Sequence, residues 1–226
     1  MKITYYGHSA LGLEIGNTHI IVDPFISANP AANLVDLDNL KADYILLTHA
    51  HYDHIYDVER IVNRTKAKII ANHEIVTWYN THKQYEGIAM NQGGSMNFDF
   101  GVLKAVTAIH SSSFPDGSYG GNPLGFIVRA DGKSIYIAGD TALTMDMKII
   151  PMFDKLDLAI LPMGSVFTMD VEEAVVASEW IECNSIMGVH YDTMPLIAID
   201  HDSSKQKFAE KGKKLTLLNI GESIQM

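Results

Sequence analysis

The sequence predicts an α/β protein in which two sheets lie between layers of helices, and three observations lead to this expectation. Strand-like segments fill both halves of the chain, and helical segments lie between them. The halves also echo each other, because residues 20–23 are similar to residues 136–140 and residues 41–47 are similar to residues 155–161. No linker or low-complexity segment divides the chain, so we expect a single domain over residues 1–226.

The first half is predicted to be rich in strands. Gly16-Asn17 between two apolar runs is a hairpin signal, and the almost wholly apolar run at 42–47 is typical of a strand covered on both faces. The expected elements are strands at 2–6, 9–15, 19–23, 42–47 and 67–71, a loop at 27–41, helices at 57–64 (with Asp57 as N-cap) and 73–82, and two or three strands within 88–110.

The second half is predicted to alternate between strands and helices after an initial hairpin. Asp131-Gly132 is the expected turn, and Asp170 with Glu173 fits the cap and N3 positions of a helix. The expected elements are a loop at 111–123, strands at 124–130, 133–138, 157–161, 185–189 and 215–219, and helices at 145–153, 171–181 and 203–211.

The composition bounds the function. Hydrophobic residues make up 47% and charged residues 19% of the chain, which suits a compact protein. No apolar run approaches the ~20 residues that span a bilayer, so we expect no membrane partner. A single cysteine, Cys183, excludes an internal disulfide framework, and the start of the chain shows no signal-peptide pattern, which favours the cytoplasm. The net charge of −10 argues against general nucleic-acid binding.

Four metal-binding side chains lie within six residues, directly after the predicted strand at 42–47: His49, His51, Asp53 and His54. In extended or turning backbone, residues i and i+2 point the same way, so His49 and His51 can share one ion. Asp53 and His54 lie at the turn into the next helix and can face a second ion. Imidazole and carboxylate ligands together suit zinc, manganese or iron rather than calcium.

Three further candidate ligands follow predicted strands: His110, Asp140 and His190. A histidine at the end of a strand is more often structural than a ligand. Here the same placement recurs three times, in a chain whose motif needs partners. The recurrence therefore indicates that these residues complete the metal site.

These segments together resemble the metallo-β-lactamase superfamily over essentially the whole chain. The order and spacing of THAHYDH (48–54), His110, GDT (139–141) and GVHYD (188–192) carry the resemblance. The resemblance is closest to the small metal-dependent hydrolase branch that is similar to L-ascorbate-6-phosphate lactonase. That narrower likeness rests on residues 6–10, 22–25 and 161–169. The superfamily implies a four-layer αβ/βα sandwich with metals at one edge.

The resemblance implies two divalent metal ions, with zinc expected first and manganese or iron as alternatives. The implied ligands are His49, His51 and His110 for the first ion, Asp53, His54 and His190 for the second, and Asp140 as a bridge between them. The commonest subclass of true β-lactamases has a cysteine where this chain has Asp140. Cys183 is better explained as a small buried residue, so we do not expect antibiotic hydrolysis.

Three residues are given roles around the ions. Asp53, catalytic together with the bridging Asp140, is expected to orient a metal-bound hydroxide and shuttle its proton. Asp23 is expected to accept the free N–H of a ligand imidazole, with a loop-starting role before Pro24 as the alternative. His8 is expected to line the pocket mouth and bind an anionic substrate, with a purely structural role as the alternative.

The expected activity is metal-dependent hydrolysis of a small, anionic ester or lactone, with a sugar phosphate as one form. The alternatives are a phosphodiesterase or nuclease, a di-iron redox protein of the same fold, and a metal-sensing protein. Substrate selectivity is expected in residues 24–36, 111–123 and 192–202, because these loops follow the strands that carry ligands. The expected partner is a small-molecule substrate, and a homo-oligomer is compatible with the resemblance.

Overall fold

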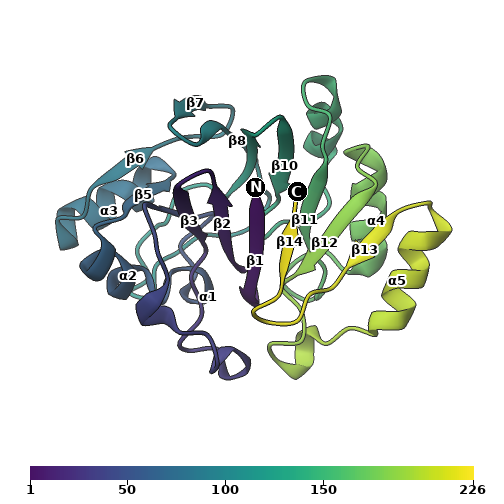
Figure 1. Cartoon of the computed structure of the whole chain (residues 1–226), viewed down its shortest axis with the longest axis horizontal. Coiled ribbons are helices and arrows are strands. Elements are labelled where there is room, and N and C mark those ends of the chain that lie inside the picture. The colour runs from purple at the N-terminus through teal and green to yellow at the C-terminus, as the bar shows by residue number, and fades with distance from the viewer.

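The two sheets predicted from the sequence form the centre of the molecule. The structure is a computed structural model that describes residues 1–226. Each sheet has seven strands. Helices α2 (Val58–Thr65) and α3 (His73–Lys83) lie on the outer side of the first sheet, and α4 (Val171–Trp180) and α5 (His201–Glu210) lie on the outer side of the second (Figure 1). The predicted αβ/βα sandwich is confirmed.

The first sheet changes from antiparallel to parallel pairing at β3. Its strands, in spatial order, are β14 (Ser223–Gln225), β1 (Lys2–Gly7), β2 (Ala10–Ile15), β3 (Thr18–Val22), β4 (Tyr44–Leu46), β5 (Lys68–Ala71) and β6 (Gly87–Ala89). The strands from β3 to β6 run parallel, so their carboxyl ends lie at one edge of the sheet.

The second sheet makes the same change at β10. Its strands, in spatial order, are β13 (Lys214–Thr216), β12 (Ser185–Val189), β11 (Leu158–Pro162), β10 (Lys133–Ile137), β9 (Leu124–Ala130), β8 (Gly101–Thr107) and β7 (Ser95–Phe98). The echo in the sequence reflects this equivalence: β3 and β10 each pair in parallel with the next strand of the echo, and each leads to an aspartate, Asp23 or Asp140.

Alternation along the strands builds three layers of core. Ile20 and Val22 of β3 point between the sheets, whereas Ile21 packs under the helices of the first half. In β10, Ile135 faces the first sheet and Tyr136 faces the helices of the second half. Both faces of the central strands are therefore buried, which explains their nearly continuous apolar sequence.

The helical segments differ from the prediction in several places. Besides α2 to α5, they are η1 (Pro30–Ala32), η2 (Leu37–Asn39), α1 (Tyr52–Ile55), η3 (Met145–Met152) and η4 (Pro195–Ile197), where η denotes a 3-10 helix. The segment predicted as a helix at 145–153 is a 3-10 helix containing Pro151, and the predicted loop at 27–41 contains two 3-10 turns. Neither α1 nor β14 was predicted, and the last predicted strand, at 215–219, is shorter and ends at Thr216.

Both predicted N-cap residues, Asp57 and Asp170, lie at the N-cap positions of their helices, but only Asp170 makes the side-chain cap bond. The capping box of α4 is present: the Asp170 carboxylate accepts from the Glu173 N–H at 2.8 Å, and the Glu173 carboxylate accepts from the Asp170 N–H at 3.2 Å. Asp57 is the N-cap residue of α2, as predicted, but its carboxylate makes no cap bond. It accepts instead from the N–H groups of Ile26 and Ser27, at 2.7 and 2.8 Å, and so anchors the loop after β3 to the start of α2.

None of the helices has the length and apolar character that a membrane crossing requires.

Candidate metal centre

All seven predicted ligands lie at the edge where the carboxyl ends of the strands from both sheets meet. His49 and His51 follow β4, and Asp53 and His54 lie in the single turn of α1. His110, Asp140 and His190 follow β8, β10 and β12. Parallel strands present their carboxyl ends at the same edge, so segments far apart in the sequence converge there. We call this edge of the molecule the metal edge.

The close approach of the two halves depends on a glycine. Gly139 has a φ of 64°, and a Cβ at this position would lie 2.8 Å from the Cβ of Thr48 and 2.8 Å from the carbonyl oxygen of Leu124. Glycine adopts this conformation without strain and leaves room for the neighbouring chain. The Asp140 carboxylate can therefore reach the motif that follows β4.

The first cluster consists of His49, His51 and His110, each of which offers a ring nitrogen within 4.8 Å of the others. His49 is fully buried, while His51 and His110 are partly exposed. The Nε2 atom of His49 lies 2.9 Å from the Nδ1 atom of His51. Three imidazoles around one point can hold a cation and leave a fourth position on the exposed side.

The second cluster consists of Asp53, His54 and His190, and His8 lies within the same 4.8 Å. The Oδ2 atom of Asp53 lies 3.9 Å from the Nε2 atom of His54 and 3.8 Å from that of His190. His54 and His190 are buried, whereas the Asp53 side chain is 30% exposed. Asp53 is thus the ligand carboxylate of this centre that faces solvent.

Asp140 lies between the two clusters. Its Oδ2 atom is 3.1 Å from the Nε2 atom of His190 and 3.3 Å from that of His54, both in the second cluster. The same oxygen is 3.7 Å from Nε2 of His110 and 4.0 Å from Nε2 of His49, in the first cluster. A single carboxylate oxygen is therefore within 4.0 Å of imidazoles from both clusters.

Several buried polar atoms of the centre lack a hydrogen-bond partner: Asp140 Oδ1, His54 Nε2 and His190 Nδ1. Buried polar atoms are almost always paired, so unpaired atoms that cluster in one place call for an explanation. A cation held by Asp140 Oδ1 and His54 Nε2 would satisfy two of the three. The donor set, five imidazoles and two carboxylates, also suits zinc, manganese or iron. The residues present therefore fit a metal site.

The charges of the centre favour cation binding. Burial alone would raise the pKa of the Asp140 carboxyl, but the imidazoles of His190 and His54 hold that pKa well below its ordinary value. Burial alone would lower the pKa of His190, but the Asp140 carboxylate raises it to about 9. The pKa of His54 is raised above its ordinary value by Asp140 and Asp23, against burial. Protons on these imidazoles balance the buried carboxylates in the place where metal charge would do so.

Asp23 lies directly behind the second cluster. Its Oδ2 atom is 3.0 Å from the Nδ1 atom of His54, and it also accepts from the Thr48 hydroxyl at 2.7 Å. The other oxygen, Oδ1, accepts from the Thr48 N–H at 2.8 Å. The carboxylate therefore turns Nε2 of His54 towards Asp140, in the geometry expected of a residue that orients a ligand.

His8 lies beneath Asp53 rather than at an open mouth, since its side chain is fully buried. Its Nε2 atom is 2.9 Å from Asp53 Oδ2, and its Nδ1 atom is 2.8 Å from the Thr193 hydroxyl. Burial lowers the pKa of His8 to about 4, so the ring is neutral. An ionised carboxylate only accepts, so Nε2 donates to Asp53 and Nδ1 accepts from Thr193. These contacts suit a positioning role, and a contact with substrate stays a prediction.

Sequence reasoning missed two residues that support the centre. Thr193 contacts His8 across 185 positions of sequence, and the Ser111 hydroxyl lies 3.2 Å from Nε2 of His51. Each lies within three residues of a predicted ligand, which was the only available signal. His201 lies outside both clusters, with its Nε2 atom 2.6 Å from Asp192 Oδ2, and the buried Cys183 is also remote from the ligands.

Comparison with known proteins agrees with this geometry. The model of the beta-lactamase superfamily domain matches residues 18–191, which include all seven ligands. The chain belongs to the metallo-β-lactamase superfamily. A UPF0173 metal-dependent hydrolase of Flavobacterium johnsoniae is 60% identical over 226 residues and all of both chains, and a UPF0173 metal-dependent hydrolase of Thermus thermophilus is 42% identical, over all of this chain and 99% of the other.

A solved structure shows the same superfamily likeness. A metallo hydrolase from the archaeon Ignicoccus hospitalis is 36% identical, with a TM-score of 0.88 over 99% of this chain and 97% of that one. The relatives establish this superfamily member as a metal-dependent hydrolase. The narrower likeness to L-ascorbate-6-phosphate lactonase stays a prediction.

Proposed function

We propose that this chain holds two divalent cations at the metal edge and hydrolyses a small ester or lactone. Zinc is the first expectation for both ions, with manganese or iron as alternatives. The first cluster would hold one ion and the second cluster the other, with Asp140 shared between them. The observation that carries the proposal is the position of Asp140 Oδ2, within 4.0 Å of two imidazoles from each cluster.

Divalent metal held by the two clusters would supply a coordinated water of lowered pKa and would polarise the carbonyl under attack. The two carboxylates of the centre suit different roles. Asp140 is 2% exposed and is surrounded by imidazoles of both clusters, which suits a fixed bridge. Asp53 is the more open carboxylate and already accepts from His8, so it suits the role of orienting the nucleophile and holding its proton.

His8 limits where that proton can go. Because Nε2 of His8 donates to Oδ2 of Asp53, this oxygen is fixed in orientation. The other carboxylate oxygen of Asp53 has no hydrogen bond within the protein and is the one that can take a proton. Thr193 holds the opposite side of the His8 ring, so the chain Thr193–His8–Asp53 positions the carboxylate.

The lack of lysine and arginine at the metal edge favours an ester or lactone over a phosphodiester as the substrate. Nucleic acids and other polyanions are recognised by Lys and Arg side chains, and the loops around the ligands contain neither. The anionic character of the substrate was expected from the resemblance alone. We therefore keep hydrolysis of an ester or lactone as the proposal, and phosphodiester hydrolysis as the alternative outcome of the test.

The test is a hydrolysis assay before and after metal exchange. Protein stripped with a chelator would be assayed with phenyl acetate, γ-butyrolactone and bis-(p-nitrophenyl) phosphate, alone and after addition of zinc, manganese or iron. We expect no turnover without metal and turnover of the ester or lactone once it is restored. Turnover of the phosphodiester alone would favour the alternative. Turnover that does not depend on metal would refute the proposal.

A further inference from the structure

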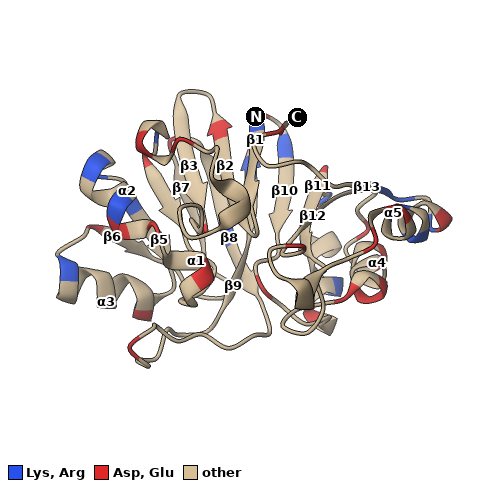
Figure 2. Ribbon diagram, turned by 90° about the horizontal axis from the view of Figure 1, so that it is seen from below, with Lys and Arg blue, Asp and Glu red and all other residues tan.

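The metal edge contains no lysine or arginine. Six loops follow strands at this edge, and we call them the edge loops: residues 23–37, 47–57, 108–123, 138–144, 163–170 and 190–200. None of the 17 Lys and Arg residues lies in them. In Figure 2 the blue segments lie along α2, α3 and α5 and near the start of β1, while the loop around α1 is tan and red. A carboxylate or phosphate on the substrate would meet no lysine or arginine side chain there.

The edge loops are instead rich in exposed apolar side chains. They contribute nine of the fourteen large hydrophobic side chains that are exposed in the whole molecule. The nine are Leu34, Tyr52, Tyr56, Ile109, Tyr119, Val166, Phe167, Met194 and Leu196. Clustered exposed apolar groups, unlike scattered ones, mark a place where a ligand or partner binds. The surroundings of the centre therefore favour an uncharged ligand.

A cavity of about 590 Å³ opens beside α1, and we call it the aromatic cavity. Five segments line it: the loop after β3, α1, the start of α2, α3 and the 111–123 loop. Its aromatic wall consists of Tyr52, Tyr56, Trp78, Tyr79 and Phe114. Its volume falls in the range of small-molecule sites, about 300–1,000 Å³, and such sites are also lined mainly by hydrophobic and aromatic side chains.

The charged residues that line the aromatic cavity are already paired within the protein. Arg60 donates to both carboxylate oxygens of Asp38, at 3.0 and 2.6 Å, and Glu59 lies 2.8 Å from Lys83 Nζ. Asp57 accepts from the loop after β3, and Asp116 accepts from Ser118. What remains for a ligand is the aromatic surface, which attracts an aromatic or bulky alkyl group.

The aromatic cavity shares the turn of α1 with two of the candidate ligands, although none of the seven lines it. Tyr52 and Ile55 line it, and Asp53 and His54 lie between them on the same turn of α1. The 111–123 loop, which supplies Phe114, is held against the motif: a Cβ on Gly120 would lie 2.5 Å from the Cβ of Ala50. Phe114 in turn stacks on Trp78 with ring centroids 4.3 Å apart. The turn of α1 thus carries two candidate ligands, Asp53 and His54, together with two residues of the cavity wall.

We propose that the substrate is uncharged and that its aromatic or bulky alkyl portion binds in the aromatic cavity while its ester or lactone lies at the ligands. This inference rests on the proposed hydrolysis and adds the class of substrate to it. The edge loops hold no lysine or arginine and Arg60 is paired with Asp38, which disfavours an anionic substrate, and the aromatic wall favours an apolar group.

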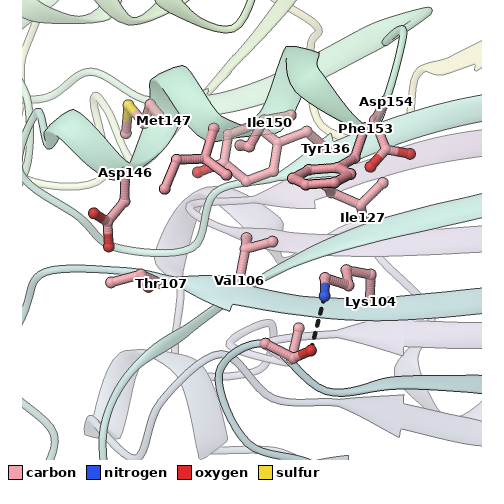
Figure 3. Close-up of a pocket in the computed structure, with 13 residues that line it drawn as sticks. Lys104, Val106, Thr107, Ile127, Tyr136, Asp146, Met147, Ile150, Phe153 and Asp154 are labelled. Carbon is pink, nitrogen blue, oxygen red and sulfur yellow. Dashed lines mark hydrogen bonds between the residues drawn. The ribbon is translucent and has the colours of Figure 1, made fainter.

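A second cavity supplies the matched control. It has a volume of about 190 Å³ and lies between η3 and the outer face of β8, β9 and β10 (Figure 3). Phe153, Tyr136 and Ile127 line it, and Lys104 donates to the Gly93 carbonyl at its margin. Unlike the aromatic cavity, it has no lining residue from α1 or from the 111–123 loop. Phe153 is 78% exposed, so its replacement by alanine is tolerated without bearing on the aromatic cavity.

The direct test uses tryptophan fluorescence, since the chain has two tryptophans and only Trp78 lines the aromatic cavity. The variant Trp180→Phe leaves Trp78 as the sole reporter. It would be titrated with two probes of equal size that hold no ester: N-acetylphenylalaninamide, which is neutral, and N-acetylphenylalaninate, which is anionic. We expect a saturable change with the neutral probe and at least about tenfold weaker binding of the anion, or 1.4 kcal/mol.

Two further variants locate the binding. In the Trp180→Phe background, Tyr56→Ala removes part of the aromatic wall at an exposed position. We expect this change to lower the affinity for the neutral probe by about tenfold. Phe153→Ala should leave binding unchanged. No saturable signal, equal or tighter binding of the anion, or equal effects of the two alanine variants would each overturn the inference.

The activity arm separates this inference from the proposed function. The metal-loaded protein would be assayed with phenyl acetate and with 4-acetoxybenzoate, its anionic counterpart. We expect kcat/KM to be higher for the neutral ester by about tenfold. Hydrolysis of both esters at equal kcat/KM, without binding of the neutral probe, would leave the function standing and reject the uncharged substrate. Binding of the neutral probe without hydrolysis of either ester would reject the proposed hydrolysis and leave only the preference of the aromatic cavity for neutral ligands.

Discussion

Asp140 is the carboxylate that lies close to candidate ligands from both halves of the chain. Its carboxylate is buried, its Oδ1 atom has no hydrogen bond, and its Oδ2 atom is within 4.0 Å of four imidazoles. Asp53, the other carboxylate among the ligands, lies near imidazoles of the second cluster and His8 only. The side chain of Asp140 therefore connects the motif at residues 49–54 to ligands that follow two other strands of the second sheet, β8 and β12.

The variant Asp140→Ala is expected to lower kcat/KM by at least about 100-fold and to lose one of the two cations, because residues behind the ligands alone contribute 10–100-fold. Steady-state kinetics and elemental analysis of the same preparation would measure both effects. Circular dichroism serves as the control for folding. Full activity with both cations retained would contradict the bridging role.

Asp23 is expected to act through His54 and not on the substrate. Asp23→Asn keeps the shape of the side chain but removes the charge that orients the His54 ring, so metal affinity should fall about 10–100-fold. Competition with a chromogenic chelator would measure the loss. The matched control is Asp43→Asn, an exposed aspartate that pairs with His19. An affinity equal to that of the native chain would show that Asp23 only holds the loop before Pro24.

At this scale the grouping of the candidate ligands was predictable from the sequence, whereas the contacts that support them were not. His49 to His54 lie close together in the sequence, and His110, Asp140 and His190 repeat one placement at strand ends. The contacts of His8 with Asp53 and Thr193 join residues 45 and 185 positions apart. No local pattern encodes such contacts, since they arise only when both sheets are assembled.

At the scale of elements, short segments with little periodicity were the ones that sequence reasoning missed. α1 is a single turn of four residues, too short for a helical pattern, and β14 is a three-residue strand that pairs with β1 across the length of the chain. Pro151 within the segment at 145–152 favours a 3-10 helix over the predicted α-helix. The apolar central strands were found because burial on both faces leaves a continuous signal.

The capping box of α4 was predicted from the sequence and is present in the structure, so its contribution to stability can be tested. Asp170→Ala removes the acceptor for the Glu173 N–H, so the free energy of unfolding should fall by about 1 kcal/mol. Urea unfolding followed by circular dichroism measures it. Glu179→Ala, at an exposed position of the same helix, is the control and should stay within about 0.5 kcal/mol of the native value. Equal effects of the two changes would show that the box contributes nothing beyond helix propensity.

At the scale of the whole molecule, metal binding should join the two halves and raise stability. The ligands come from both sheets, so cations bind the folded chain and not the unfolded one. A ligand at 100 times its Kd adds about 2.7 kcal/mol to the free energy of unfolding. Chelation is therefore expected to lower the melting temperature, measured by calorimetry, and added zinc should restore it. A chelator that leaves the melting temperature of the native chain unchanged would contradict a bound metal that connects the halves.

The most direct test of the central claim is the metal content of the native protein, purified without chelators and measured by elemental analysis. The two clusters on either side of Asp140 predict close to two equivalents of zinc, manganese or iron per chain. About one equivalent would mean that only one of the clusters binds metal. Less than one equivalent, not restored by adding metal, would contradict the dinuclear centre.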